Sequence, residues 1–171
     1  MLISKNMNGA INRQICYEFS AMLQYVAIAS YFVGDSLHEL AAHFYRQAEE
    51  ERNHAMRFIK YLLDAGGQVE INDVPAPQNR FTSAEEAVKL SLDQEKKVTE
   101  QINALVEVAM KEKDYITQNA LTWFVNEQLE EVSSMENLLK IVQLAGIKNL
   151  LYVEDYLARH KGATAGATSK I

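Results

Sequence analysis

The sequence has a single cysteine and no long apolar run. Cys16 alone cannot form a disulfide within the chain, and it cannot build a multi-thiolate metal site within one subunit. No apolar stretch approaches the ~20 residues that a bilayer-spanning helix needs. The first residues, MLISKNMNGAINRQ, lack the apolar segment of a signal peptide. We therefore expect a cytoplasmic protein with no membrane partner.

An excess of positive charge is also missing. The formal net charge is −6, which argues against a nucleic-acid partner held through phosphate contacts. An acidic balance suits a protein that attracts cations, although many proteins that bind no metal are equally acidic.

Helix breakers are scarce. The 171 residues include 7 glycines and 2 prolines, Pro75 and Pro77. Most of the glycines fall between segments with helical periodicity, a distribution that is typical of long helices with few breaks. The periodicity predicts five helices, at about residues 6–33, 37–65, 84–112, 115–145 and 147–160.

Three helix starts carry capping signals. Ser36 with Glu39, and Ser83 with Glu86, have the spacing of a capping box, in which the two side chains bond free backbone N–H groups. Asp114 is a candidate N-cap for the fourth helix.

These helices predict an all-α fold. The two tight connections make the first and second helices antiparallel neighbours, and likewise the third and fourth. The connection over roughly residues 66–82 is long and contains both prolines, which favours a four-helix bundle with a long crossover and a short fifth helix. We expect one domain over residues 1–160 and a flexible tail over 161–171, which is small and polar.

Each long helix places a glutamate near the middle of its apolar seam. The seam recurs in steps of four and three residues. In this register the four acids are Glu18, Glu51, Glu95 and Glu131, and His54 follows Glu51 on the same face. Gln128 occupies the seam position that precedes Glu131. One seam glutamate alone is usually a surface residue, but four that converge require an explanation.

Four buried carboxylates would repel one another, and burying even one without a partner is expensive. Either protonation or bound cations would relieve the cost, and two divalent metals would neutralise all four charges. Oxygen ligands with one imidazole suit iron or manganese and also accept zinc. Glu50, Glu127 and Glu130 flank the cluster. Their spacing fits either a solvated acidic face or a third, weaker metal position.

The residues resemble the non-haem bacterial ferritins, most closely the bacterioferritin B type, over essentially residues 1–160. The matching stretches are YEFSAMLQYVA, HFYRQAEEERNHAM, LDQEKKVTEQIN and WFVNEQLEEV. The resemblance implies a ferroxidase: an enzyme that oxidises Fe(II) with O₂ or H₂O₂ at a di-iron centre within each subunit. It also implies storage of the ferric mineral in a homo-oligomeric cage of 24 subunits with octahedral symmetry.

The resemblance also implies a role for each residue. Glu18, Glu51 and His54 match the ligands of the first iron. Glu51, as a bridge, matches the second-iron ligands together with Glu95 and Glu131, and Gln128 lies nearby. The third-site ligands of the family match Glu50, Glu127, Glu130 and Glu131. Tyr25 and Trp123 match aromatic residues beside the centre and are candidate electron donors, although core packing explains them equally well.

Two departures bear on cofactors. Haem-binding bacterioferritins carry a second Glu-x-x-His on the fourth helix, whereas residues 127–130 here read Glu-Gln-Leu-Glu. They bind haem through a methionine one residue after the second-helix glutamate, whereas this chain has Arg52. We therefore expect iron and no haem.

Three other functions compete with this interpretation. A mini-ferritin would hold its metals between subunits and would lack the fifth helix. A rubrerythrin-like peroxidase would need four cysteines for its rubredoxin domain, but a di-iron oxidase of an organic substrate stays open. A metal-free adaptor bundle would leave the seam glutamates unexplained.

Overall fold

The computed structural model describes residues 1–160. They form α1 (Lys5–Gly34), α2 (His38–Asp64), α3 (Ala84–Glu112), α4 (Tyr115–Ala145), a 3₁₀ turn (Ile147–Asn149) and α5 (Leu150–Arg159). Over the described range there is no β-strand, so the predicted all-α class is confirmed. The bounds of the four long helices match the prediction to within two residues, whereas the predicted fifth helix is divided into the turn and α5.

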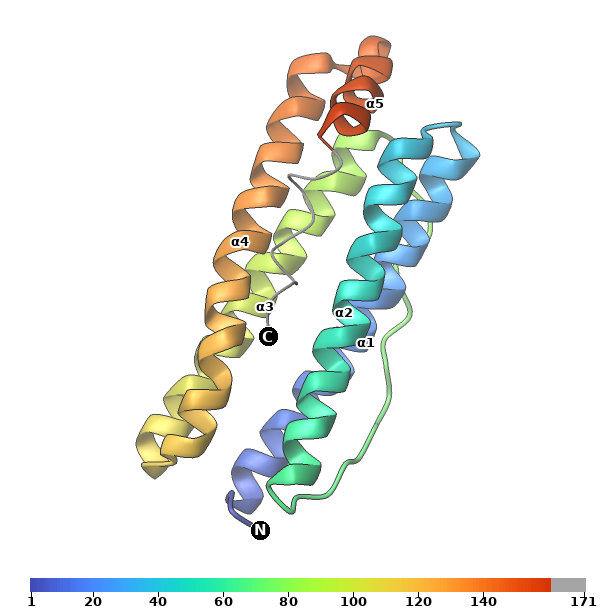
Figure 1. The fold of residues 1–171 in the computed structure, drawn as a ribbon. Coiled ribbons are helices and arrows are strands. Elements are labelled where there is room, and N and C mark those ends of the chain that lie inside the picture. Colours follow the sequence, from blue (N-terminus) through green and yellow to red (C-terminus); the bar gives the residue numbers. More distant parts are fainter. Residues whose placement is uncertain (161–171) are drawn as a thin grey trace.

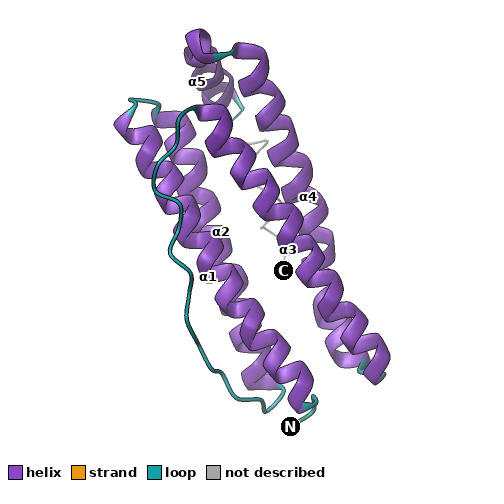
Figure 2. Ribbon diagram, turned by 180° about the vertical axis from the view of Figure 1, so that it is seen from behind, coloured by secondary structure: helices purple, strands orange, loops and turns teal. Residues whose placement is uncertain are grey.

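The four long helices form two packed pairs (Figure 1). α1 packs mainly against α2, α3 packs mainly against α4, and α1 also contacts α3. Between α2 and α3 the chain runs back along the length of the bundle without regular structure (Figure 2). This segment is the predicted long crossover, and it makes α2 and α3 run in the same direction.

Amide side chains of α1 hold the crossover in place. Asn8 Oδ1 accepts a hydrogen bond from the Gln68 backbone N–H at 2.8 Å, and Asn8 Nδ2 donates to the Gln68 carbonyl at 3.1 Å. Gln24 makes the same pair of bonds with the Gln78 backbone, at 2.8 and 2.9 Å. The extended segment therefore pairs some of its backbone N–H and C=O groups with side-chain amides of α1, in place of the backbone partners that a strand would have.

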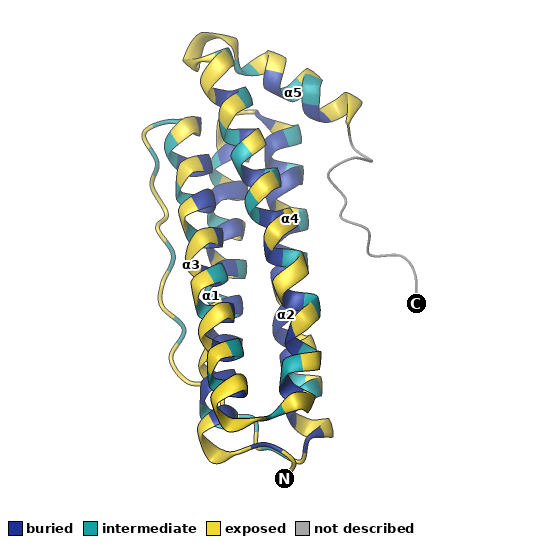
Figure 3. Ribbon diagram, turned by 90° about the vertical axis from the view of Figure 1, so that its left-hand side faces the viewer, coloured by how far each residue is buried: buried dark blue, intermediate teal, exposed yellow. Residues whose placement is uncertain are grey.

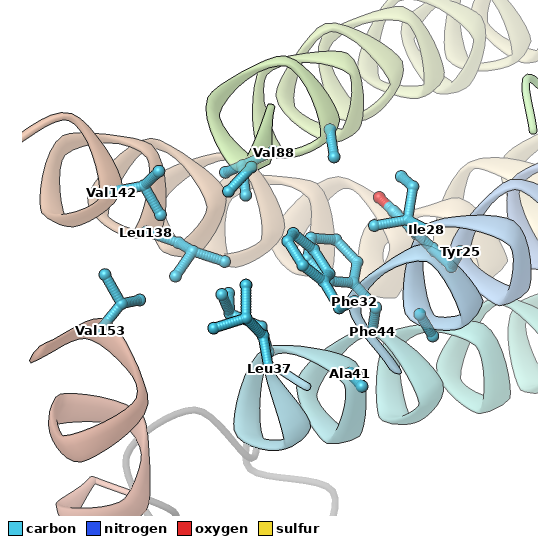
Figure 4. Packing of buried hydrophobic residues seen from close by; sticks show 14 of the residues in the cluster. Tyr25, Ile28, Phe32, Leu37, Ala41, Phe44, Val88, Leu138, Val142 and Val153 are labelled. Carbon is cyan, nitrogen blue, oxygen red and sulfur yellow. The ribbon is translucent and has the colours of Figure 1, made fainter. Parts of the chain in front are cut away.

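The core consists of two apolar clusters, one toward each end of the bundle. The cluster beside α5 includes Tyr25, Phe32, Phe44, Val88 and Leu138 (Figure 4). The other includes Ile11, Phe58, Ile102, Leu121 and Phe124. Buried faces of all four helices point inward along the whole length (Figure 3). The polar residues that interest us lie between the two clusters, in a dry interior.

The predicted N-caps at Ser83 and Asp114 are confirmed, although Glu86 Oε2 accepts from the Thr82 N–H at 2.7 Å rather than from the Ser83 N–H that a capping box requires. The Ser83 hydroxyl accepts from the Glu86 N–H at 3.1 Å, and Asp114 Oδ1 accepts from the Thr117 N–H at 3.0 Å. The capping box at Ser36 is wrong: α2 begins after Leu37, which makes no side-chain cap, and Ser36 has a left-handed backbone with φ of 60°.

A carboxylate from α5 caps α2 instead. Glu154 accepts hydrogen bonds from the backbone N–H groups of Glu39 and Leu40, at 2.8 and 2.9 Å. An anion at a helix N-terminus also interacts favourably with the helix dipole. Together with the buried side chains of Val153 and Leu157, this contact fixes α5 across the end of the bundle.

In the part of the chain that the structure describes, no helix is both long and apolar enough to cross a membrane. The predicted flexible tail, residues 161–171, lies outside the described residues.

Candidate metal centre

The four seam glutamates meet in the middle of the bundle, one from each long helix. Glu18, Glu51, Glu95 and Glu131 are only 1, 1, 0 and 7% exposed. Glu51 interacts electrostatically with Glu18, Glu95 and Glu131, so the four carboxylates lie together between the two apolar clusters. His54, one turn after Glu51, is 5% exposed and joins them.

Glu18, Glu51 and His54 form the tightest group. Each offers one ligand atom, and these three atoms all lie within 4.8 Å of one another. His54 Nδ1 is 3.4 Å from Glu51 Oε2. Oε2 of Glu18 and Oε2 of Glu51 are buried without a hydrogen-bond partner in the described structure. Buried acceptors of this kind are rare unless something else satisfies them, and a cation between them would do so.

Glu95 is held from two sides. The hydroxyl of Tyr25 donates a short hydrogen bond to its Oε1, and Gln128 Nε2 lies 3.5 Å from its Oε2. Thr99 in turn donates to Gln128 Oε1 at 2.8 Å, which fixes the orientation of the amide. Tyr25 and Gln128 therefore act directly on a carboxylate of the cluster.

Burial shifts the titration of all four acids in one direction. Desolvation, followed by repulsion from Glu51, raises the pKa of Glu18 well above its ordinary value. Desolvation and repulsion from Glu95 do the same to the pKa of Glu51 and raise the pKa of Glu131 to about 9. Desolvation also raises the pKa of Glu95. Without a cation, the cluster therefore resists full ionisation at neutral pH.

A second group involves the flanking acids. Ligand atoms of His54, Glu127 and Glu131 lie within 4.8 Å of one another. Glu50 is half-buried next to this group, and desolvation raises its pKa. Glu130 is exposed and belongs to neither group. Of the predicted third-site residues, the structure thus brings Glu127 and Glu131 together with His54.

Aromatic rings bracket His54. The Trp123 ring meets it edge-on, with centroids 5.4 Å apart and planes at 75°, and Phe124 meets it at 6.2 Å and 79°. The guanidinium of Arg57 lies 4.0 Å above the Trp123 ring. Trp123 therefore lies directly beside the predicted metal ligand, and the Arg57 cation covers one face of the ring.

Sequence reasoning missed several polar neighbours of the centre. Gln14 donates to Glu18 Oε1 at 2.9 Å, and Gln47 donates to Glu131 Oε2 at 3.1 Å. The spacing Gln-x-x-x-Glu occurs at both positions and was a usable signal for Gln14, because residues four apart share a helix face. The Gln47 contact crosses to another helix, so no local spacing could reveal it.

The donor set fits hard divalent ions. It combines carboxylate oxygens with one imidazole nitrogen, as iron, manganese and zinc sites do. Two such ions would balance the four negative charges and would satisfy the two orphaned oxygens of Glu18 and Glu51.

The chain is similar to known proteins over most of its length. Residues 8–145 match the family "Ferritin-like domain". The chain is 46% identical to ferritin BfrB of Mycolicibacterium smegmatis over 96% of this chain and 90% of the relative. It is 37% identical to a bacterial non-heme ferritin of Staphylococcus aureus over 89% of this chain and 92% of the relative.

A solved structure is similar throughout. The open pore ferritin of Archaeoglobus fulgidus superimposes with a TM-score of 0.89 at 34% identity, covering 92% of this chain and 97% of that one. Family match, sequence identity and fold coincide over nearly the whole length of the chain. The chain therefore belongs to the ferritin family, with the non-haem bacterial ferritins among its relatives.

Proposed function

We propose that this protein stores iron, and that it oxidises Fe(II) to Fe(III) at the centre formed by Glu18, Glu51, His54, Glu95 and Glu131. The observation that carries the proposal is the convergence of four buried carboxylates, with two orphaned oxygens between them. Iron is the substrate and the cargo. A cytoplasmic location and a cage of 24 subunits with octahedral symmetry complete the proposal.

The protein's own residues bind and orient the two ferrous ions. Glu18 and His54 hold one ion, Glu95 and Glu131 hold the other, and Glu51 bridges them. Each Fe(II) gives up one electron. With O₂ as oxidant, two electrons and two protons yield H₂O₂; with H₂O₂, they yield two waters. The carboxylates favour the products because anionic oxygen ligands stabilise the higher charge of Fe(III).

Tyr25 and Trp123 lie close enough to the proposed iron ligands to donate an electron during oxidation. The Tyr25 hydroxyl touches Glu95, and the Trp123 ring touches His54. We propose both as donors to a partly reduced oxidant. Glu127 and Glu131, with Glu50 and Glu130 at the rim, form the proposed third position, from which Fe(III) leaves for hydrolysis and deposition in the interior of the cage.

We propose that this chemistry proceeds without haem. Arg52, at the position where haem-binding relatives carry a methionine, is exposed and forms an ion pair with Glu49 at 3.0 Å. Each of the four long helices supplies its own ligand, so the centre is complete within one subunit. This supports a full ferritin over a mini-ferritin, whose metals would lie between subunits.

The proposal is tested by adding Fe(II) aerobically to apo-protein, following ferric absorbance and sizing the particle by light scattering in the same sample. Glu51→Ala should slow oxidation by about tenfold or more, because it removes the bridging ligand. Glu49→Ala is the matched control, since Glu49 lies two residues away with a side chain 61% exposed. Equal oxidation rates in the two variants would refute the assignment, and a stable monomer or dimer would refute the cage.

A further inference from the structure

Gln47 is a buried amide that joins two carboxylates of different helices. It lies on α2, one turn before Glu51, and is 4% exposed. Its Nε2 donates to Glu50 Oε2 at 2.5 Å on its own helix and to Glu131 Oε2 at 3.1 Å on α4. Nε2 is the donor in both hydrogen bonds, so the nitrogen end of the amide faces both acids.

The other amides of the centre act differently. Gln14 donates to Glu18 alone, and Gln128 donates to Glu95 while it accepts from Thr99. Both stabilise a single carboxylate of the di-iron centre. Gln47 instead links Glu131, a ligand of that centre, to Glu50, a flanking acid.

Without Gln47, Glu50 and Glu131 would tend to separate. Like charges repel, and Glu50 is only half-buried, so its side chain has the option of turning toward water. α2 packs mainly against α1, and α4 mainly against α3, so side chains rather than close backbone packing connect α2 to α4 at this level. Each hydrogen bond from Gln47 takes up one oxygen of its acceptor and leaves the other oxygen available to a cation.

We infer that Gln47 is a positioning residue that builds the third metal position by holding Glu50 beside Glu131. The inference rests on the proposed function. Neighbours that hydrogen-bond to ligating carboxylates orient them, and removing such a neighbour weakens metal binding by about 10- to 100-fold. Gln47 thereby couples the third position to the di-iron centre through the shared carboxylate of Glu131.

The test compares Gln47→Leu with Gln14→Leu in the assembled apo-protein. Leucine keeps most of the glutamine volume and removes the donor. Zn²⁺, which is not oxidised, is titrated by calorimetry, and circular dichroism checks the helices. In Gln47→Leu, the weakest class of Zn²⁺ site should lose about 10- to 100-fold in affinity, while the site of Glu18, Glu51 and His54, whose side chains accept no hydrogen bond from Gln47, should remain. In Gln14→Leu, a tighter site should weaken while the weakest class is unchanged.

Each outcome decides between the proposals. Unchanged or tighter binding at the weakest site of Gln47→Leu would overturn the inference. A parent protein that binds only two Zn²⁺ per subunit would also overturn it, but would leave the di-iron centre standing. A parent that binds none would refute the proposed function itself.

A second variant guards against failure of Gln47→Leu to fold. Gln47→Met replaces the amide with a flexible side chain that adapts to the cavity. A crystal structure of its Zn²⁺-loaded form should show Glu50 turned away from Glu131. Glu50 still beside Glu131, with a third ion bound, would contradict the positioning role.

Discussion

At the scale of single residues, the buried acids make stability depend on pH. Burial, with repulsion from Glu95, raises the pKa of Glu131 to about 9, whereas a glutamate in an unfolded chain titrates near about 4.3. Folded apo-protein therefore keeps a proton on Glu131 that the unfolded chain releases. The contribution of this group to stability is full below about pH 4 and is lost as the pH rises toward 9.

We predict that the thermal midpoint of the metal-free protein falls between about pH 5 and 9, and that Glu131→Gln makes this fall shallower. Differential scanning calorimetry at several pH values measures it. Glu49→Gln is the control, because its exposed side chain has no comparable environment. Added Zn²⁺ should stabilise the parent most at the upper end of the range, where a cation replaces the proton. Identical slopes in the parent and Glu131→Gln would count against the buried-acid explanation.

Trp123 reports directly on the surroundings of His54, because it is the only tryptophan in the chain. The Arg57 guanidinium, 4.0 Å above the ring, shields one face from water. We predict that Arg57→Ala shifts the fluorescence of Trp123 to the red and raises its quenching by acrylamide by about twofold, since the loss of a cation–π partner exposes the ring.

Arg52→Ala is the matched control for this prediction. Arg52 is also an exposed cation on α2, but it forms an ion pair with Glu49. Its removal should leave the emission maximum and the quenching unchanged. A red shift of the same size in both variants would mean that loss of positive charge, rather than loss of ring cover, causes the effect.

At the scale of elements, the carboxylate of Glu154 anchors α5 to the start of α2. Glu154 accepts two backbone N–H groups at the start of α2, and α5 buries only Val153 and Leu157. We predict that Glu154→Ala destabilises the folded protein by about 1–2 kcal/mol, the typical loss for a helix cap. Amide exchange should accelerate throughout α5 and in the first turn of α2.

Asp155→Ala provides the comparison for Glu154→Ala. Asp155 lies next to Glu154, but its ion pair is with Arg159 in the same exposed helix. Exposed pairs of this kind contribute little to stability, so amide exchange at the start of α2 should not change. If both variants released α5 equally, the long-range cap would have no special role.

The elements also show how far the sequence could predict the structure. Helical periodicity located the four long helices, because each buries a continuous stripe of side chains. Local caps such as Ser83 and Asp114 were predictable, since donor and acceptor lie within one turn. The start of α2 was not, because its cap, Glu154, is more than a hundred residues away. In the same way, seam spacing shows that Glu18 and Glu51 face the interior. It cannot show that Gln47 donates a hydrogen bond to Glu131 on another helix.

At the scale of the whole molecule, the acidic layer divides the core. An apolar cluster on each side keeps water away from Glu18, Glu51, Glu95 and Glu131. Four buried glutamates stabilise the folded apo-protein less than apolar residues of similar volume would at the same positions. Burial of further apolar surface between subunits would offset this loss, and the corner between α4 and α5 exposes apolar side chains.

The corner between α4 and α5 is unusually apolar for an exposed surface. Four large apolar side chains there are strongly exposed, Leu144 at 88%, Ile147 at 81%, Leu151 at 77% and Tyr152 at 72%. Exposed apolar side chains gathered in one stretch of chain are candidates for an interaction surface, and the proposed cage supplies further copies of the chain to cover them. Leu151→Asp combined with Tyr152→Asp should shift the particle to species much smaller than 24 subunits in light scattering, because burying two carboxylates per copy at a shared contact is expensive. Lys148→Gln, an exposed change in the same corner that introduces no carboxylate, should leave the size unchanged. An intact large particle in the double variant would show that the cage does not assemble through this surface.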